Sequence, residues 1–518
     1  MTAVAPYRSA VRPTRDRFSH LVRAEWTKFR TVRGWVITLS AAALTIILLG
    51  VMTATGNTMT CSKGPVEVPC PAAPTGPGGE AVTDRFYFVH RSLTGDGAIT
   101  AHISSMSGRI RRPDPEGLIP GIVPWAKAGL MVKNGVRQGA AYAAVMVTAK
   151  HGVRMQHNFT EDTAGSAGAL PRWLRLVRSG ATLTGYESPD GAQWTKVSTV
   201  TLAGLPQTVE IGMFAASPGD LTVTQSVLGA TSSAGRFAEV SAVFDQVGVQ
   251  GGVSGGTWAR DDVGVEMELD GKTPHHPGGL VQSGDTFTLT GVGDMAPAME
   301  DGGVRVEFTL TGAVVGLIMV IVVAAMFVTV EYRRGLIRTT LLASPRRGRA
   351  LVAKAVVIGL AAFAAGLIGA GVTVPLGKSI MLSKGTLVSP VSAFTEVRVI
   401  VGFAALLAAF AVLSLGLGAL FRRSVVGVTA AIVLIVLPYT LATVSLLPTG
   451  ASQWLTRITP AAGFAVLQSI PEYAHVLGPY APATGYYPLP PWGGLAVACA
   501  YAGLALTLAT LRLRRSDV

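Results

Sequence analysis

The chain has 518 residues, a mean hydropathy of +0.45 and only 14% charged residues. A soluble protein of this length needs more charge and polarity to cover its surface, so this composition excludes an ordinary soluble protein. The net charge of +13 would suggest nucleic acid as a partner in a soluble chain, but the distribution of that charge indicates another cause.

Six apolar blocks of about 20 residues predict transmembrane helices, because about 20 residues at about 1.5 Å each cross the hydrocarbon core of a bilayer. Their interiors contain no Asp, Glu, Lys, Arg or His. We therefore expect a membrane all-α bundle of six transmembrane helices. The blocks are Trp35–Thr53, Phe308–Val330, Ala355–Pro375, Val399–Leu420, Val425–Leu447 and Trp492–Leu511.

The basic residues are distributed in the positive-inside pattern. Residues 56–307 contain 19 Lys/Arg and 24 Asp/Glu, a net charge of −5, whereas the remainder carries +18. Most of the remaining basic residues lie in four places: Arg8 to Arg33, Arg333 to Lys354, Arg422–Arg423 and Arg512 to Arg515. We therefore expect a multi-pass protein of the cell membrane, with both termini cytoplasmic and residues about 55–307 extracytoplasmic. The positive charge is then topological and does not imply nucleic acid.

Residues 1–34 predict a cytoplasmic amphipathic leader that lies against the headgroups, because apolar residues recur at helical spacing among basic ones. A solvated basic leader is the alternative. Residues 35–54 form the first transmembrane helix, and residues 55–83 follow it as a Pro/Gly-rich stalk.

The stalk contains two of the three cysteines. On the oxidising side of the membrane, Cys61 and Cys70 are predicted to form a disulfide, with two free thiols as the alternative. Cys499 lies in the last apolar block, where we expect a small packing residue.

Residues 84–248 change to a period of two, which is typical of β-strands. Turn signals separate the strands at Gly95-Asp-Gly, Asn134-Gly, Ser179-Gly and Pro189-Asp-Gly. Regular short strands without helical stretches predict an all-β extracytoplasmic jelly-roll or sandwich domain. Residues 249–307 are expected to form a Gly-rich linker and a short second β region.

Residues 308–518 contain the other five transmembrane helices. Between them we expect a cytoplasmic loop at residues 331–354. The apolar, Pro-rich and aromatic segment at residues 447–491 is typical of an extracytoplasmic re-entrant segment.

Two segments of this membrane part resemble one family. The leader His20-Leu-Val-Arg-Ala-Glu-Trp-Thr-Lys-Phe-Arg-Thr-Val-Arg-Gly-Trp35 and the loop from Glu331-Tyr-Arg-Arg-Gly through Ser344-Pro-Arg-Arg-Gly-Arg to Lys354 resemble actinobacterial type-2 ABC transporter permeases. The membrane resemblance covers about residues 14–54 and 308–518.

This resemblance implies the permease subunit of an ABC exporter, which moves a substrate of unknown identity across the cytoplasmic membrane. The partners it implies are a cytoplasmic ATP-binding cassette ATPase and a second permease chain, in a homodimer or a heterodimer. ATP and Mg would bind the ATPase, with no cofactor in this chain and no enzymatic activity of its own. In agreement, the sequence lacks a Gly-x4-Gly-Lys-Ser/Thr loop. Ion-coupled carriers usually keep a charged residue at mid-membrane, so secondary transport is disfavoured.

The resemblance also places an ATPase-coupling surface on the cytoplasmic face. Basic clusters alone could instead set topology and contact lipid phosphates. The candidate coupling residues are Glu25, Trp26, Lys28, Glu331, Arg333, Arg334, Gly335, Arg338, Pro345, Arg346, Arg347 and Arg349.

Residues about 84–248 resemble concanavalin A-like (laminin-G-like) jelly-roll domains, on the stretch from Trp173-Leu-Arg-Leu-Val-Arg-Ser-Gly to Gln193-Trp194. Some such domains bind glycans and others are structural. Trp125, Tyr186 and Trp194 are candidate residues for stacking on a ligand such as envelope glycan, with a place in the sandwich core as the alternative. The alternative function is a membrane-anchored glycan-recognition protein without transport activity.

Enzymatic sites in the β domain have weaker signals. Glu266, Glu268 and Asp270 alternate along one strand as glycosidase carboxylates could, but such runs are usually solvated faces. His275–His276 lacks further ligands at metal-site spacing. We therefore assign no catalytic and no metal residues.

Overall fold

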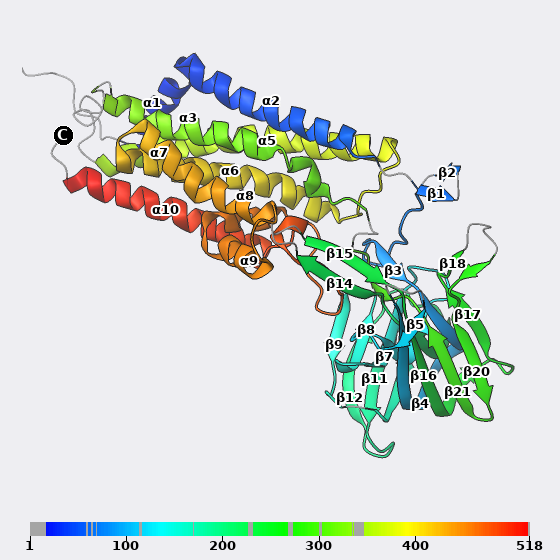
Figure 1. Cartoon of the computed structure of the whole chain (residues 1–518). Coiled ribbons are helices and arrows are strands. Elements are labelled where there is room, and N and C mark those ends of the chain that lie inside the picture. The colour runs from blue at the N-terminus through cyan, green and yellow to red at the C-terminus, as the bar shows by residue number, and fades with distance from the viewer. Residues whose placement is uncertain are drawn as a thin grey trace, which may run out of the picture.

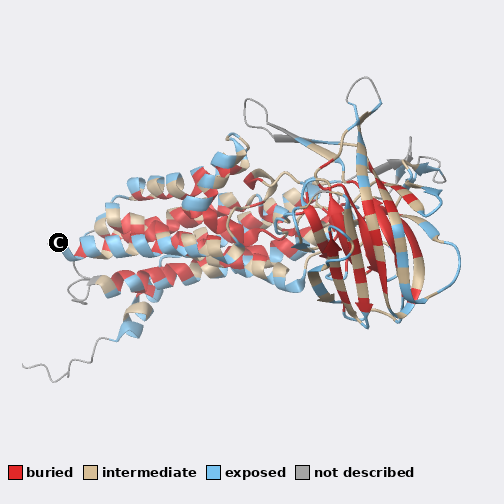
Figure 2. Cartoon of the chain, turned by 90° about the horizontal axis from the view of Figure 1, so that it is seen from below, coloured by how far each residue is buried: buried red, intermediate tan, exposed pale blue. Residues whose placement is uncertain are grey.

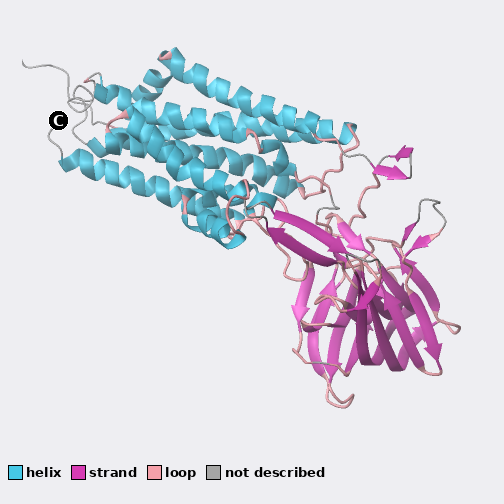
Figure 3. Cartoon of the chain, in the orientation of Figure 1, coloured by secondary structure: helices cyan, strands magenta, loops and turns pink. Residues whose placement is uncertain are grey.

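In a computed structural model the chain forms a helical bundle and a separate β domain (Figures 1 and 3). The structure describes residues 17–515, except residues 59–60, 64–65, 69, 113–116, 169, 226–230, 268–272, 300–302, 334 and 336–346. Figure 1 shows α1 (Phe18–Thr31) and the C-terminal end of the last helix at one end of the bundle and the β domain at the other. We call these ends the terminal end and the β-domain end.

Six helices in the described part of the chain are long and apolar enough to cross a membrane, which confirms the predicted bundle. One of them is broken: α7 (Ser424–Ala431) passes through the π-helical turn η2 (Ile432–Val436) into α8 (Leu437–Thr443). Pro438 has no N–H to donate to the preceding turn, so the ladder changes register there. The others are α2 (Arg33–Gly56), α3 (Ala313–Arg333), α5 (Arg347–Ser383), α6 (Ala393–Phe421) and α10 (Pro491–Arg515).

The observed helices differ from the predicted blocks mainly at α5. The sequence predicted a loop at residues 331–354 and an apolar block ending at Pro375, but α3 runs to Arg333, and α5 begins at Arg347 and continues through this proline to Ser383. Its contacts with α2 and α6 hold the helix together across the missing hydrogen bond. Small residues allow such close packing: a Cβ on Gly316 would lie 2.6 Å from the Ile46 side chain, and one on Gly366 2.9 Å from the Ala404 backbone.

The segment between α8 and α10 packs against the bundle. It consists of α9 (Thr449–Ile458) and the 3-10 helices η3 (Pro460–Leu467) and η4 (Pro482–Thr484). Every residue of η3 is buried, against α6, α9 and α10. The 3-10 helix η1 (Val306–Leu310) precedes α3 at the β-domain end of the bundle.

The β domain is an antiparallel sandwich-like sheet of 14 strands, as the sequence predicted. The main path runs β12-β11-β10-β4-β13-β6-β7-β8-β9. The pairs β1-β2, β14-β15, β18-β19 and β22-β3 form separate two-stranded sheets. The strands of the described chain, in this sheet and in those pairs, are β1 (Cys61–Lys63), β2 (Val66–Val68), β3 (Val82–Asp84), β4 (Phe86–Arg111), β5 (Leu118–Pro120), β6 (Lys127–Lys133), β7 (Tyr142–Thr148), β8 (Gly152–His157), β9 (Glu161–Ala164), β10 (Arg172–Ser179), β11 (Thr182–Ser188), β12 (Thr195–Thr201), β13 (Thr208–Ala216), β14 (Asp220–Gln225), β15 (Thr231–Arg236), β16 (Ala238–Val253), β17 (Ala259–Val263), β18 (Glu266–Met267), β19 (Pro274–His275), β20 (Gly279–Ser283), β21 (Thr286–Gly291) and β22 (Met295–Pro297).

The 26-residue strand β4 organises this sheet. Along one edge it pairs first with β13 and then with β10, and along the other it pairs with β17 and β16. Alternate side chains therefore enter two apolar cores. Figure 2 shows the buried residues of these strands in red. The larger core includes Val89 and Ile99, and the smaller one includes Phe86 and Phe88.

The predicted boundary at residue 248 lies inside a strand. β16 runs through it to Val253, so the glycines expected to form a linker lie partly at the end of a strand. β17 and β21 then join β4 and β16 in the same sheet, so the expected second β region completes the domain. Gly251, at φ +109°, allows a register shift in this strand that the sequence does not reveal.

Candidate functional site

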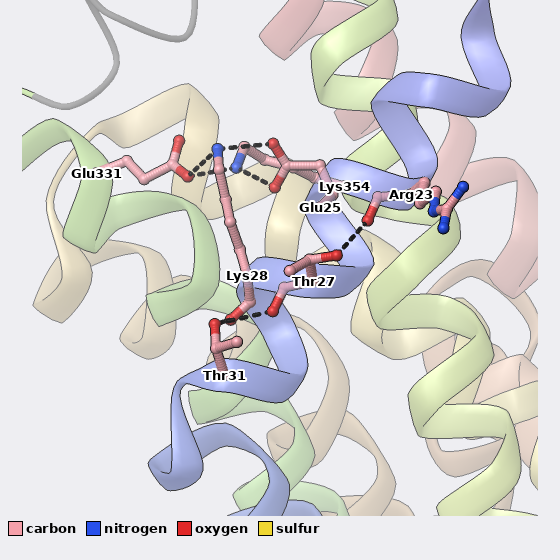
Figure 4. A network of polar contacts seen from close by, with 7 residues as sticks. All are labelled: Arg23, Glu25, Thr27, Lys28, Thr31, Glu331 and Lys354. Carbon is pink, nitrogen blue, oxygen red and sulfur yellow. Dashed lines mark hydrogen bonds and ion pairs between the residues drawn. The ribbon is translucent and has the colours of Figure 1, made fainter.

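A cluster of buried charges joins three helices at the terminal end of the bundle (Figure 4). Lys354 on α5 lies at its centre: its Nζ is 2.7 Å from Glu25 Oε2 and 2.6 Å from Glu331 Oε1. Glu25 belongs to α1 and Glu331 to the last turn of α3. Lys28, one turn after Glu25, adds contacts of 2.9 Å to Glu25 and 3.3 Å to Glu331.

The cluster is nearly closed to solvent. Lys354 is 2% exposed, Glu25 4% and Glu331 8%, and only the side chain of Lys28 reaches out. Burial, the largest single effect, lowers the pKa of Lys28, but the carboxylates of Glu25 and Glu331 outweigh it and the pKa is raised. Two cations and two carboxylates give a neutral set, and neutral pairing is the condition under which buried charges are tolerated.

Aromatic rings surround the cluster and hold α1 against the bundle. Phe29 stacks on Trp26 with 5.7 Å between centroids and meets the edge of Phe327 at 6.1 Å. Lys354 Nζ is 5.2 Å from the centroid of the Phe327 ring. The short helix α1 is therefore attached to α3 and α5 both by ion pairs and by packing.

The cluster connects the two helices that flank one loop. Glu331 lies in the last turn of α3 and Lys354 about two turns into α5, and both side chains bind Glu25 or Lys28 of α1. Any displacement of α3 or α5 at these positions must move α1 or break a buried ion pair.

The structure separates the candidate coupling residues into two groups. Glu25 and Glu331 point inward, are paired with Lys354 and Lys28, and are buried, so they position helices and are not exposed to a partner. Trp26, Arg333, Gly335 and Arg349 are exposed. The remaining candidates, Arg334, Arg338, Pro345 and Arg346, lie outside the described residues, as does the side chain of Arg347. Lys354, at the centre of the charge cluster, is predicted from the sequence only as the last residue of the cytoplasmic loop. The sequence signal that could have identified it is a lysine directly beside an apolar block.

A second feature is a cavity of about 790 Å³ at the β-domain end of the bundle. It lies among η1, α3, α6, α8 and η4. Its wall is mainly apolar, with Leu317, Phe403, Phe410 and Phe464 among its members, and Arg305 and Glu307 are its charged lining residues. Charged and apolar groups thus line one site.

The β domain meets the bundle beside this cavity. His475 Nε2 donates to the Phe159 carbonyl at 2.9 Å, and its ring lies edge-on to Trp125 with centroids 6.5 Å apart. Tyr486 donates its hydroxyl to Met299 Sδ at 3.3 Å. β3 and β22, the strands by which the chain enters and leaves the domain, pair with each other.

The candidate stacking residues of the β domain do not form one surface. Trp125 is 5% exposed, stacks on His151 with centroids 3.9 Å apart and carries the Arg154 guanidinium over its ring. It therefore takes the structural role. Tyr186 and Trp194 are partly exposed on or after β11.

The other predicted sites are placed as follows. Glu266 is exposed and paired with Arg85, whereas Glu268 and Asp270 lie outside the described residues. No group of three or more metal-binding side chains occurs among the residues that the structure describes. Cys70 is disulfide-bonded and Cys499 is free. The side chain of Cys61, its predicted partner, is not among those described, so this pairing stays a prediction.

Comparisons with known proteins assign no family. No family model matches the chain, and no curated protein matches it. Among solved structures, the chain is similar to a functionally unknown protein from Saccharomyces cerevisiae, at 13% identity and a TM-score of 0.20, over 33% of this chain and 76% of that one. It is also similar to SCP-B, a member of the eqolisin family of peptidases in complex with the tripeptide Ala-Ile-His, at 9% identity and a TM-score of 0.24, over 40% of this chain and 98% of that one. Scores this low carry no conclusion about activity.

Proposed function

We propose that this chain is the membrane-spanning permease subunit of an ABC exporter. In this proposal the terminal end of the bundle is cytoplasmic, residues about 55–307 are extracytoplasmic, and a separate ATPase binds the cytoplasmic face. Two permease chains, identical or related, complete the transporter. The basic residues of the terminal end support this orientation, because positive charge is retained in the cytoplasm.

The buried charge cluster is the observation that carries the proposal. An ATPase outside the membrane can drive transport only if its movement reaches the spanning helices. The loop between α3 and α5 is where we expect the ATPase to act, since Glu331 in the last turn of α3 and Lys354 about two turns into α5 are both bound to α1. Movement of the loop would therefore shift α1, α3 and α5 together rather than deform the loop alone.

Exposed groups next to the cluster suit a protein partner. Trp26 is 45% exposed, and Arg333 and Arg349 flank the loop with their side chains exposed. Aromatic and arginine side chains are enriched at protein interfaces. The inward Glu25 and Glu331 then have a different role from these residues, since they transmit force and do not bind the partner.

The test is ATP hydrolysis by the complex isolated from native membranes in mild detergent. We expect hydrolysis that orthovanadate inhibits, although this chain has no phosphate-binding loop of its own. The double charge reversal Arg338→Glu/Arg346→Glu should lower the co-purified activity at least about tenfold, as expected when about 1.4 kcal/mol of interface energy is lost.

Arg457→Glu is the matched control, because Arg457 is an exposed basic residue on α9, at the β-domain end. It should leave the co-purified activity unchanged. The proposal is wrong if the native preparation hydrolyses no ATP, or if the double reversal retains as much activity as the control.

A further inference from the structure

The cavity at the β-domain end has a long apolar part. Its lining runs along α6 from Phe403 to Phe410, a distance of roughly 10 Å at about 1.5 Å per residue. Leu317 on α3 and Phe464 on η3 close it from the other sides. Its volume is in the range of small-molecule sites, which hold about 300–1,000 Å³. The apolar part suits a hydrocarbon chain.

Arg305 lies at the other end of the cavity, just before η1. Its guanidinium carbon is 3.9 Å from the centroid of the Tyr486 ring, so the planar group is held in one position. Its Nη1 is buried and has no hydrogen-bond partner among the described residues. A buried charged donor without an acceptor is costly, and an anionic oxygen from a ligand would satisfy it.

Glu307 adds an acceptor beside it. One carboxylate oxygen accepts from the Ser469 backbone N–H at 3.1 Å, whereas Oε2 is buried without a partner in the described part of the chain. Burial raises the pKa of Glu307 above its usual value, although the hydrogen bond from the Ser469 backbone opposes this. Within the described part of the chain, Arg305 and Glu307 thus leave one donor and one acceptor unpaired at the same end of the cavity.

We infer that this cavity binds a lipid-like amphiphile whose headgroup carries an anionic phosphate and a hydrogen-bond donor. The phosphate would accept from Arg305, the headgroup hydroxyl or amine would donate to Glu307, and an acyl chain would fill the space between Leu317, Phe403 and Phe410. A soluble anion would satisfy Arg305 but leave the apolar part empty, which favours the lipid. That this lipid is a transport substrate rests on the proposed function; that it binds does not.

Photolabelling of the full chain in maltoside micelles, without ATP, tests the binding. The probes are phosphatidylglycerol and diacylglycerol, each with a diazirine on one acyl chain, and labelled peptides are located by mass spectrometry. Phosphatidylglycerol should label peptides of α3, α6 and α8 about tenfold more strongly than diacylglycerol, as expected from one charged hydrogen bond.

Two variants and a control separate headgroup from chain binding. Arg305→Gln should reduce phosphatidylglycerol labelling to the diacylglycerol level. Thr440→Trp, which places a ring into the cavity from an exposed lining position, should reduce labelling by both probes. Arg457→Gln should change neither, since Arg457 is exposed outside the cavity.

The inference is overturned if both probes label equally, or if Arg305→Gln labels like the unaltered chain. Its failure is distinguishable from that of the proposed function, because labelling requires no ATPase. If labelling occurs as expected but phosphatidylglycerol does not stimulate ATP hydrolysis by the native complex, the binding site stands and its role in transport is wrong.

Discussion

Replacing Lys354 by Met tests whether the buried charge cluster fixes α1 to the bundle. The four side chains of the cluster are neutral together, and removal of Lys354 leaves Glu25 and Glu331 with Lys28 alone. One negative charge is then uncompensated at positions 4% and 8% exposed. Breaking a buried ion pair in this way costs about 3–5 kcal/mol, so we expect Lys354→Met to lower the free energy of unfolding by that amount.

Two further variants make this expectation specific. Lys378→Met breaks an ion pair with Glu396 between α5 and α6, where the two side chains are 35% and 24% exposed, so it should cost about 1 kcal/mol or less. The double variant Glu25→Gln/Lys354→Met restores neutrality, because Glu331 remains paired with Lys28. It should therefore be more stable than Lys354→Met alone.

The measurement is unfolding of the full chain in mixed micelles by titration with SDS, followed by tryptophan fluorescence. Trp26 and Trp35 lie close to the cluster and report on it. The reasoning is refuted if Lys354→Met and Lys378→Met cost the same, or if Glu25→Gln worsens Lys354→Met instead of relieving it.

Three other outcomes are expected. In the β domain, Asp84→Asn removes the counter-charge of Lys133 at 0% exposure and should lower the free energy of unfolding by about 3–5 kcal/mol. Asp220→Asn, at the part-exposed pair with Arg236, should lower it by about 1 kcal/mol or less. Trypsin resistance of the full chain compares the two variants. In α10, Gly494→Ala places a Cβ 2.2 Å from the Ala462 carbonyl and should cost about 1–3 kcal/mol, but Gly503→Ala meets nothing within 4 Å and should be neutral or stabilising in the same SDS titration. Burial lowers the pKa of His475 in the folded protein below 6.5, so the unfolded chain binds a proton at this imidazole more tightly than the folded protein does. The folded protein therefore keeps its full stability above about pH 6.5 and loses stability as the pH falls toward the folded pKa. His475→Gln keeps a donor for Phe159 and should flatten the fall in Tm between about pH 7.5 and 5.5; an unchanged slope would exclude His475 as a source of the pH dependence.

The sequence by itself determined the two-part architecture of this protein. Hydrocarbon thickness sets a length of about 20 apolar residues for a span, and strand alternation sets a period of two, so both signals are local and can be read along the chain. The six helices and the antiparallel β domain follow from them. Helix ends were less accurate where tertiary packing carried α5 past Pro375.

Only the tertiary structure decided which charged residues act together. Glu25 lies more than 300 positions before Glu331 and Lys354 in the chain. Each of the three residues alone looks like a charge at the edge of an apolar block. Folding brings them within hydrogen-bond distance, and burial then turns exposed candidates for docking into a neutral internal clamp. The cavity with Arg305 also depends on packing, because its lining comes from η1, α3, α6, α8 and η4. No local pattern encodes a contact between elements so far apart in the chain, so the clamp and the cavity emerge only from the fold.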